Sequence, residues 1–223
     1  MVYSAKNVKK LRSFVVVLLA LIVALAGAMQ LYGCSSEARE QGSAVSKQPS
    51  DESTYNIIYN QALLNVMGYS TADEAIRDSD ESNDPDSEAG YLEAHVLDDG
   101  SVSLTYSSEQ YDYTLDWTKK QIESSCSSFA SLYDGCSFEV DDGWQTIDCY
   151  LTPDVATSVG TWLSSIQIVE IYCAQMQTLE HPGDASWTVT INLYNVETGQ
   201  LVVSASSEGG TLSFTPEDWG VSS

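Results

Sequence analysis

The fold is indicated most clearly by residues 136–154, CSFEVDDGWQTIDCYLTPD. Apolar and polar residues alternate on both sides of Asp141-Asp142-Gly143, which predicts two antiparallel strands joined by a turn. A turn at the last two of these residues places Phe138 opposite Ile147 and leaves the polar residues on the other face. The next residues, Thr152-Pro153-Asp154, predict a helix start because they combine an N-cap side chain, a proline in the first turn and an acid near the positive end of the helix.

Two further hairpins are predicted on the same grounds. One turns at Asp98-Asp99-Gly100 and the other at Glu197-Thr198-Gly199, each between alternating apolar residues. In the first of them, a three-residue loop pairs Val96 with Val102 and leaves Gly100 in a left-handed conformation. A two-residue loop would instead pair apolar with polar positions, so the three-residue loop is favoured.

Each hairpin follows a segment with helical spacing of its apolar residues. The first segment is 51–68, where Gly68 stands at the expected helix end. The second begins at Ser107, with Gln110 three residues on as in a capping box. The third runs from Thr152 through Val159 and is ended by His181-Pro182-Gly183; its broad apolar side predicts the most buried helix of the chain.

The order helix, hairpin, helix, hairpin, helix, hairpin predicts an α+β fold. We expect one antiparallel sheet of about six strands, built from the three hairpins, with helices packed on one face. The predicted organisation is a lipoprotein signal peptide (1–33), a flexible tether (34–51), a single α+β domain (52–207) with an acidic loop (73–90), and a C-terminal tail (208–223) in which Phe214 and Trp219 are candidates to dock on the domain.

The N-terminal segment predicts export and lipid attachment. Four basic residues precede an apolar stretch from Phe14 to Met29, and Leu31-Tyr32-Gly33-Cys34 follows. That order is typical of a lipoprotein signal, so we expect lipid on the Cys34 sulfur and a location on the extracytoplasmic side of the cell membrane. The apolar stretch is shorter than the roughly 20 residues of a membrane-spanning helix. An uncleaved membrane anchor and a secretory signal cut without lipidation are the alternatives; Tyr32, where such boxes carry a small residue, departs from the pattern.

The charge of the chain excludes several partners. The whole sequence has 9 basic and 32 acidic residues; four of the basic residues and no acidic residue precede Cys34, so the part beyond it has 5 basic and 32 acidic residues, a formal charge of −27. Such a surface repels nucleic-acid phosphates and anionic polymers, so we expect no nucleic-acid binding. The charge also keeps a tethered domain soluble.

The four cysteines beyond Cys34 predict two disulfides, because an exported protein matures in an oxidising environment. The strand register of the central hairpin places Cys136 opposite Cys149, which leaves Cys126 and Cys173 to link the two long helices. The alternative is a bridge from each helix to a strand, Cys126 with Cys136 and Cys149 with Cys173. We expect no zinc site, because no two cysteines are close in sequence and both histidines are isolated.

Acidic residues offer two further candidate sites. One resembles a calcium loop in its alternating oxygen ligands: Asp78, Asp80, Ser82, Asp84, Asp86 and Glu88. It departs from that pattern at Asn83, where glycine is required, and at Ala89, where glutamate is required, so a solvated loop is expected. The other candidate consists of the pairs Asp98-Asp99 and Asp141-Asp142, although aspartate is common in turns for turn geometry alone.

Aromatic residues gather near the junction of the first hairpin and the second helix: Tyr91, Tyr106, Tyr111, Tyr113 and Trp117. We expect them to pack in the core, and a glycan- or peptide-binding surface is the alternative. His95 is expected to be an exposed strand residue, and His181 to lie at a helix end.

Several features of the chain resemble a group of small uncharacterised lipoproteins of Gram-positive gut bacteria. These features are the exported start, the hairpin Asp98-Asp99-Gly100-Ser101-Val102, the helix opening at Ser107, the acidic hairpin that follows, and the turn Asn195-Val196-Glu197-Thr198-Gly199. The likeness covers roughly residues 91–207 and consists of turn chemistry, so it implies a fold and an address but no site residues or activity.

The sequence therefore predicts a membrane-anchored extracytoplasmic lipoprotein with a non-enzymatic binding or envelope-structural domain and no cofactor. Its expected partners are the lipid bilayer, through Cys34, and a protein or glycan of the envelope. The alternative function is an envelope hydrolase that uses acidic residues. A two-lobed transport receptor is disfavoured, because the domain is too small for two lobes.

Overall fold

The computed structural model describes residues 53–158, 162–209 and 212–220. The predicted signal peptide and tether, the lipid-attachment residue Cys34, and Val159 of the third predicted helix lie outside these residues. None of the helices in the described ranges is long and apolar enough to cross a membrane.

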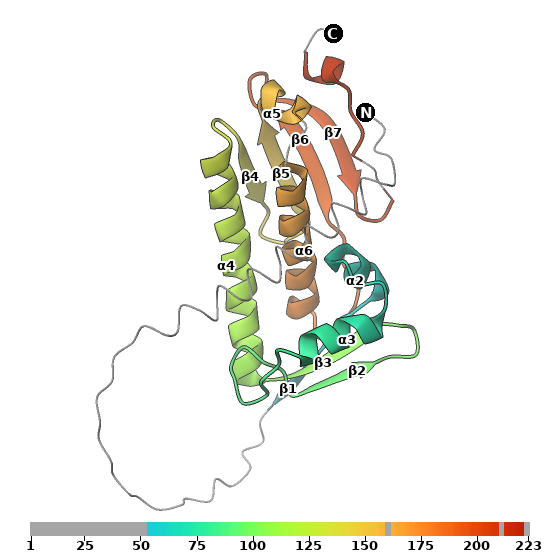
Figure 1. The fold of residues 1–223 in the computed structure, drawn as a ribbon. Coiled ribbons are helices and arrows are strands. Elements are labelled where there is room, and N and C mark those ends of the chain that lie inside the picture. The colour runs from blue at the N-terminus through green and yellow to red at the C-terminus, as the bar shows by residue number, and fades with distance from the viewer. Residues whose placement is uncertain (1–52, 159–161, 210–211, 221–223) are drawn as a thin grey trace, which may run out of the picture. The chain divides into compact units, whose positions relative to one another are not determined.

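Seven strands and five α-helices form the described part of the chain, which is an α+β fold (Figure 1). In chain order they are β1 (Thr54–Tyr59), α2 (Gln61–Met67), α3 (Ala72–Asp80), β2 (Glu93–Val96), β3 (Val102–Ser107), α4 (Ser108–Leu132), β4 (Ser137–Val140), β5 (Thr146–Leu151), α5 (Pro153–Thr157), α6 (Trp162–Glu180), β6 (Thr190–Asn195) and β7 (Gln200–Ser206), followed by the 3-10 helix η2 (Pro216–Trp219).

The strands form two sheets, so the prediction of a single six-stranded antiparallel sheet is wrong. One sheet has the order β1-β3-β2 and is antiparallel; the other has the order β4-β5-β6-β7. In the second sheet, β5 and β6 run parallel. The two helices between them form a crossover that returns the chain to the same end of the sheet, which parallel neighbours require. The alternation of the three predicted hairpins is confirmed, but alternation does not reveal which strands are neighbours.

Residues 51–68, expected to be one helix, are divided between a strand and a helix. All of β1 pairs with β3, so Tyr55 and Tyr59 are strand residues. The helix begins only after Asn60, whose side-chain Oδ1 accepts a hydrogen bond from the Leu63 backbone N–H at 2.8 Å. Its end at Gly68 is confirmed.

The first hairpin has the predicted register. Val96 pairs with Val102 and Ala94 with Leu104. Gly100 has φ +81°, the left-handed conformation that a three-residue loop requires at this position. The third hairpin, β6–β7, also forms around its predicted turn, and Leu193 pairs with Val203.

The register of the central hairpin is two residues away from the prediction. Phe138 lies opposite Cys149, and Val140 lies opposite Ile147. The turn is longer than expected because Asp141 Oδ1 accepts hydrogen bonds from the backbone N–H groups of Gln145 (2.7 Å) and Thr146 (2.8 Å). Trp144 takes φ 58° in this turn. A shift of two preserves the face on which each side chain lies.

The helix starts predicted at Ser107 and Thr152 are confirmed. Ser107 caps α4 and forms a capping box with Gln110, and Thr152 caps α5 with Pro153 in its first turn. The third predicted helix is divided, however, because α5 ends at Thr157 and α6 begins at Trp162. As predicted, α6 is the most buried helix and ends before His181-Pro182-Gly183.

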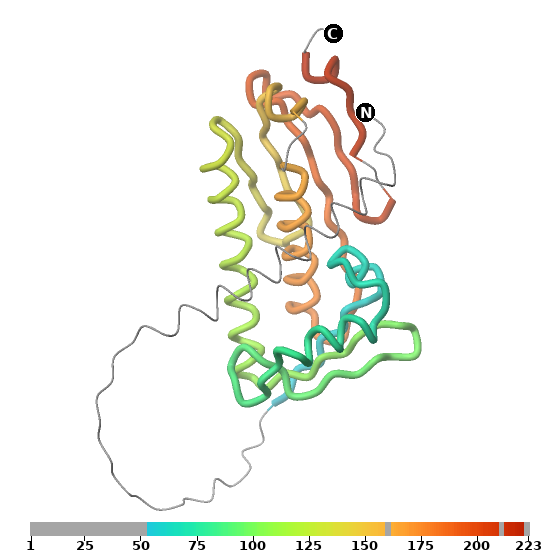
Figure 2. The backbone as a smooth tube through the Cα atoms, viewed as in Figure 1, coloured from blue at the N-terminus to red at the C-terminus, as the bar shows by residue number. Residues whose placement is uncertain are grey.

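The acidic segment 73–90, expected to be a loop throughout, is helical in its first half. Thr71 caps α3, and Asp73 and Glu74 lie in its first turn, where acids interact favourably with the helix dipole. The remaining loop lies beside the first turns of α4 (Figure 2), where Gln110 donates hydrogen bonds to the backbone oxygens of Pro85 and Ser87.

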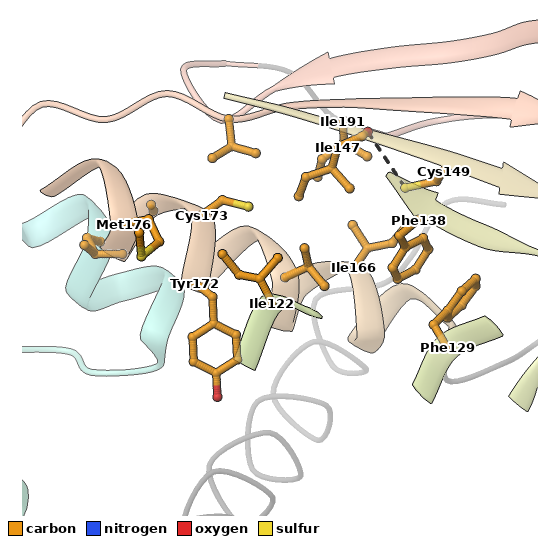
Figure 3. Packing of buried hydrophobic residues seen from close by; sticks show 14 of the residues in the cluster. Ile122, Phe129, Phe138, Ile147, Cys149, Ile166, Tyr172, Cys173, Met176 and Ile191 are labelled. Atoms are coloured by element: carbon orange, nitrogen blue, oxygen red, sulfur yellow. Dashed lines mark hydrogen bonds between the residues drawn. The ribbon is translucent and has the colours of Figure 1, made fainter. Parts of the chain in front are cut away.

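The main core lies between the four-stranded sheet and the helix pair α4 and α6, which lie side by side (Figure 1). Figure 3 shows Ile147 and Cys149 of β5 meeting Ile166 and Cys173 of α6 in this layer. The C-terminal tail docks as expected: Trp219 is buried, and Phe214 contacts the rings of Trp162 and Trp219.

Candidate ligand-binding cavity

A cavity of about 220 Å³ lies where the three-stranded sheet, α2 and α3 meet the helix pair α4 and α6. Its walls combine aromatic rings, aliphatic side chains and a few uncharged polar groups. The lining residues are Tyr59, Leu64, Met67, Tyr69, Ala75, Ile76, Ser79, Tyr91, Val102, Leu104, Tyr106, Thr114, Trp117, Thr118 and Gln175. None of these residues has a side chain that is charged at neutral pH.

The alternation of β1 and β3 brings the sheet residues into this cavity. Tyr59 pairs with Val102, and Ile57 pairs with Leu104, so these residues lie on one face of the sheet. Tyr106 lies on the same face two residues beyond Leu104. Because that face is turned towards the helices, β1 and β3 supply a wall of aromatic and aliphatic groups.

The tyrosine hydroxyls of the cavity are largely engaged with protein groups. Tyr59 and Tyr106 are hydrogen-bonded to each other through their side chains. Burial raises the pKa of Tyr59 to about 12 and that of Tyr106 well above its ordinary value. Tyr91 Oη donates to the Asp80 carboxylate; burial, and then that bond, raise the pKa of Tyr91. Burial also raises the pKa of Tyr69, and the charges of Asp78 and Glu74 add to the effect. These phenols are therefore neutral at physiological pH.

Gln175, one of the lining residues, has a side-chain atom that is buried and has no protein partner. Gln175 Oε1 is buried, and no group of the described chain donates a hydrogen bond to it. Tyr172 Oη, three residues earlier on α6, is also buried and unpaired, and the Tyr172 ring packs edge-to-face on Trp117 at 5.8 Å. A buried acceptor without a donor costs about 1–3 kcal/mol, so these unpaired atoms reduce the stability of this part of α6.

The volume limits what the cavity can hold. An apolar cavity of about 150 Å³ accommodates benzene, and pockets for drug-sized molecules begin at about 300 Å³. At about 220 Å³, this cavity fits a molecule of one or two fused rings.

A larger hollow of about 650 Å³ lies between α3 and β2, but it is an open cleft. It is lined by Asp73, Ile76, Arg77, Asp80, Glu81, Ala94, His95 and Val96. The His95 side chain is 63% exposed and contacts Glu93 at 3.2 Å, as expected for an outward-facing strand residue. Water competes for every polar group of such a cleft, so the cleft can contribute less to binding than the smaller and less open cavity.

The outer face of the four-stranded sheet is polar, and its side chains form hydrogen bonds with one another. Asn192 Nδ2 donates to Asp148 Oδ1 at 2.8 Å, and Ser204 Oγ donates to Asn192 Oδ1 at 2.7 Å. Tyr150 and Tyr194 stack on each other with ring centroids 5.1 Å apart. This face therefore has less unmet hydrogen-bonding capacity than the cavity.

The four cysteines expected to form disulfides are free thiols in the structure. Cys149 lies opposite Phe138, so the register argument for a bridge from Cys136 to Cys149 is wrong. Burial raises the pKa of Cys149 and of Cys173, and the nearby Cys126 adds to both shifts. Thiols held in the protonated state are weak nucleophiles. The formation of disulfides stays a prediction.

The acidic candidates are used in local structure. Asp99 Oδ1 accepts the Ser101 N–H at 2.9 Å, and Asp141 closes the central hairpin, so each pair shapes its own turn. The two hairpins belong to different sheets. In the segment that resembles a calcium loop, Asp80 lies in α3 and is bonded by Tyr91. Within the described ranges, no group of three or more His, Cys, Asp or Glu residues is arranged to hold a metal ion.

The prediction that the aromatic cluster packs in the core is confirmed for Tyr91 and Tyr106, while Tyr111 and Trp117 are partly buried against the core. The cavity beside these residues was not predicted. Tyr91 and Tyr106 are buried and Trp117 lines the cavity beside them, whereas Tyr111 stacks on Tyr55 at 4.0 Å. The sequence did not predict Gln175 as a lining residue, because its only indication is a polar residue within an apolar helix.

Comparisons with known proteins found nothing similar: no protein-family model, curated protein or solved structure matches this chain.

Proposed function

We propose that this chain is an extracytoplasmic lipoprotein, anchored through Cys34, whose α+β domain is a non-enzymatic module that binds a small uncharged molecule in the tyrosine-lined cavity. The single observation behind the binding role is the cavity of about 220 Å³, whose walls are aromatic and aliphatic side chains with a few uncharged polar groups. The anchor is supported by the basic residues, apolar stretch and cysteine at the N-terminus.

A binding module is favoured over the envelope hydrolase by the use of the carboxylates. A hydrolase of the predicted kind needs two carboxylates that face one substrate. The Asp98-Asp99 and Asp141-Asp142 pairs lie in turns of different sheets, and Asp99 and Asp141 accept backbone hydrogen bonds there.

Thermal unfolding of the full chain in a nonionic detergent tests the binding role. The probes are anisole, benzoate and benzylamine, which place a neutral, an anionic and a cationic group on one ring. Because a ligand that binds only the native state stabilises it, anisole should raise the melting temperature with increasing concentration. The charged probes should not, because the lining offers no opposite charge.

The matched control is Ser79→Phe, which fills the cavity from α3. Ser79 lines the cavity and is half-buried, so the larger ring has room to adjust. Circular dichroism checks that the variant is folded. An equal response of Ser79→Phe and the wild type to anisole would exclude the cavity as the binding site.

The anchor is tested separately in bacterial cells that express the full chain. Mass spectrometry of the membrane fraction should find a product that begins at Cys34 and is heavier by its lipid. Cys34→Ala should lose both the processing and the added mass. An unmodified N-terminal signal in the wild type would contradict the lipoprotein assignment.

A further inference from the structure

We propose that the open cleft between α3 and β2 binds an extended segment of a partner protein that carries lysine or arginine, and that this segment pairs with the free edge of β2. The cleft and the tyrosine-lined cavity are different hollows, so this inference does not depend on the proposed function. An open cleft holds a small molecule poorly, but an extended chain can lie along it and pair with a strand through backbone hydrogen bonds.

The strand β2 has a free edge. It stands at the end of the order β1-β3-β2, and no other strand of the described ranges pairs with its second side. The Leu97 N–H, just beyond β2, donates to the Ser101 oxygen at 2.8 Å, which places Leu97 among the residues that bond across the hairpin. Because such residues alternate along antiparallel strands, Ala94 and Val96 direct their N–H and C=O groups away from β3. These groups are a template for a further strand.

The cleft follows this edge. Its lining residues on β2 are consecutive, Ala94, His95 and Val96, although neighbouring residues of a strand face opposite sides of the sheet. A hollow that reaches all three therefore lies along the edge of the strand. The other wall is one stripe of α3 and its C-cap, with helical spacing: Asp73, Ile76, Arg77, Asp80 and Glu81. Because α3 packs against β2 and β3 (Figure 1), the helix and the strand edge form the two sides of the cleft.

Part of the cleft is apolar. Val96 is 45% exposed, and Ile76 and Ala94 also line the cleft. Val96 and Ala94 pair with Val102 and Leu104, so all four lie on the sheet face that α3 covers. A segment added beside β2 would place every second side chain on this face, where it would cover the exposed apolar surface.

The charge of the cleft indicates which side chains such a segment carries. Three carboxylates line it, those of Asp73, Asp80 and Glu81, and all three residues are exposed. The lining has one arginine, Arg77, and its guanidinium forms an ion pair with Asp78 at 3.3 Å. The excess of negative charge complements lysine or arginine and repels an acidic segment.

Charge also disfavours a second copy of this chain as the occupant. Two β2 edges could pair with each other, but each copy would bring its own carboxylates to the contact. The part of the chain beyond Cys34 has a formal charge of −27, so two copies repel each other as a whole. A basic segment of another protein is attracted by the same charge.

Synthetic peptides test the proposal by isothermal titration calorimetry with the full chain in a nonionic detergent. The probe is acetyl-KTKTKTK-amide, in which threonine favours an extended chain and lysine occupies every second position. The charge control is acetyl-ETETETE-amide. Two further forms of the basic peptide carry N-methyl groups, one on every threonine nitrogen and the other on every lysine nitrogen. Alternate residues of a strand direct their N–H groups to opposite sides, so only one set can pair with β2.

We expect the wild type to bind the basic peptide and not the acidic one. One N-methylated form should bind at least about tenfold more weakly than the parent peptide, and the other within about twofold of it, because only one set of methyl groups meets β2. Equal affinities of the two N-methylated forms would overturn strand pairing, since side-chain attraction alone does not distinguish them. Failure of the wild type to bind the basic peptide would also overturn the proposal.

Variants of the protein locate the site. Val96→Pro removes an outward N–H and places a ring on the edge, a position where edge strands tolerate proline; it should weaken the basic peptide at least about tenfold. Circular dichroism checks its fold. Asp73→Asn with Glu81→Gln leaves the edge intact and should weaken binding about fivefold, or about 1 kcal/mol. Unchanged binding by either folded variant would overturn the assignment to this cleft.

A matched charge control uses exposed acids outside the cleft. Glu123→Gln on α4 with Asp142→Asn in the central turn removes the same number of charges and should change the affinity less than about twofold. Equal weakening by the two double variants would show attraction to the overall charge and overturn the site. Analytical ultracentrifugation tests the second copy: a wild-type dimer that Val96→Pro dissociates would mean that this chain pairs with itself, which would also overturn the proposal.

Discussion

The two sides of the α4–α6 helix pair differ in how completely they are filled and paired. Against the four-stranded sheet, Ile147, Cys149, Val169, Cys173 and Leu193 are all 0% exposed, and the layer is closed. Against the three-stranded sheet, the same helices border the tyrosine-lined cavity, with unpaired polar atoms on α6. A closed apolar layer contributes stability, whereas a cavity and a buried acceptor without a donor each reduce it. The comparison therefore separates the region that stabilises the fold from the region in which we propose that a ligand binds.

The largest effect is expected in the closed layer. Leu193 lies in β6 with no exposed surface, so Leu193→Ala should lower the free energy of unfolding by about 2–5 kcal/mol through lost burial and the cavity that it leaves. Urea denaturation monitored by circular dichroism measures the change. Leu201→Ala on the neighbouring strand is the control: Leu201 is 47% exposed, so its loss should stay within about 0.5 kcal/mol. Equal effects would show that this layer is not the stabilising core.

Two glutamines on α6, Gln177 and Gln175, differ in their hydrogen bonds, and replacing each by leucine tests how much those bonds contribute to stability. Gln177 Nε2 donates to the backbone oxygens of Trp144 (2.7 Å) and Thr188 (3.0 Å), and its Oε1 accepts the Thr188 N–H at 3.0 Å. Gln177→Leu should therefore cost about 1–3 kcal/mol, because it leaves buried backbone groups unpaired.

The matched substitution, Gln175→Leu, should leave the free energy of unfolding unchanged or raise it by about 1 kcal/mol, because it removes an acceptor that has no donor. Urea denaturation of both variants makes the comparison. A large loss in Gln175→Leu would mean that its amide contributes to stability, and the distinction between the two regions would be weaker.

Glu170 is an ionisable residue on the otherwise largely apolar helix α6, one turn before Cys173. Burial raises its pKa from 4.5 to about 7. Between these values the native state keeps a proton that the unfolded state has released, so the contribution to stability is complete below pH 4.5 and is lost as the pH rises through 7. With allowance for solvent contact, the wild type should lose about 1–3 kcal/mol more than Glu170→Gln between pH 5 and pH 8. Parallel slopes for the two proteins would rule out a protonated Glu170.

The smallest effect is expected at the junction of the two regions, where β3 leads into α4. Ser107→Ala removes the N-cap hydroxyl that accepts the Gln110 N–H, and should cost about 1 kcal/mol. Ser127→Ala on the same helix is the control. The Ser127 hydroxyl donates to a carbonyl of its own helix, so its loss should be near zero. Thermal unfolding of both variants measures the difference.

Local chemistry made much of this structure predictable. Ser107 and Thr152 define helix starts through hydrogen bonds to residues three positions on, and Asp98-Asp99-Gly100 defines a hairpin within a few residues. These interactions depend on neighbours in sequence. The central hairpin shows the limit, because Asp141 could close a shorter or a longer turn and the choice moved the register by two residues.

The sequence by itself determined the α+β class, the three hairpins and the helix caps, because these follow from periodicity and from short-range hydrogen bonds. Only the tertiary structure decided the rest. It placed β1 beside β3, set β5 parallel to β6, and brought Tyr59, Trp117 and Gln175 to one cavity from three distant parts of the chain. Such contacts depend on how whole layers pack, and no spacing along the chain records which faces will meet.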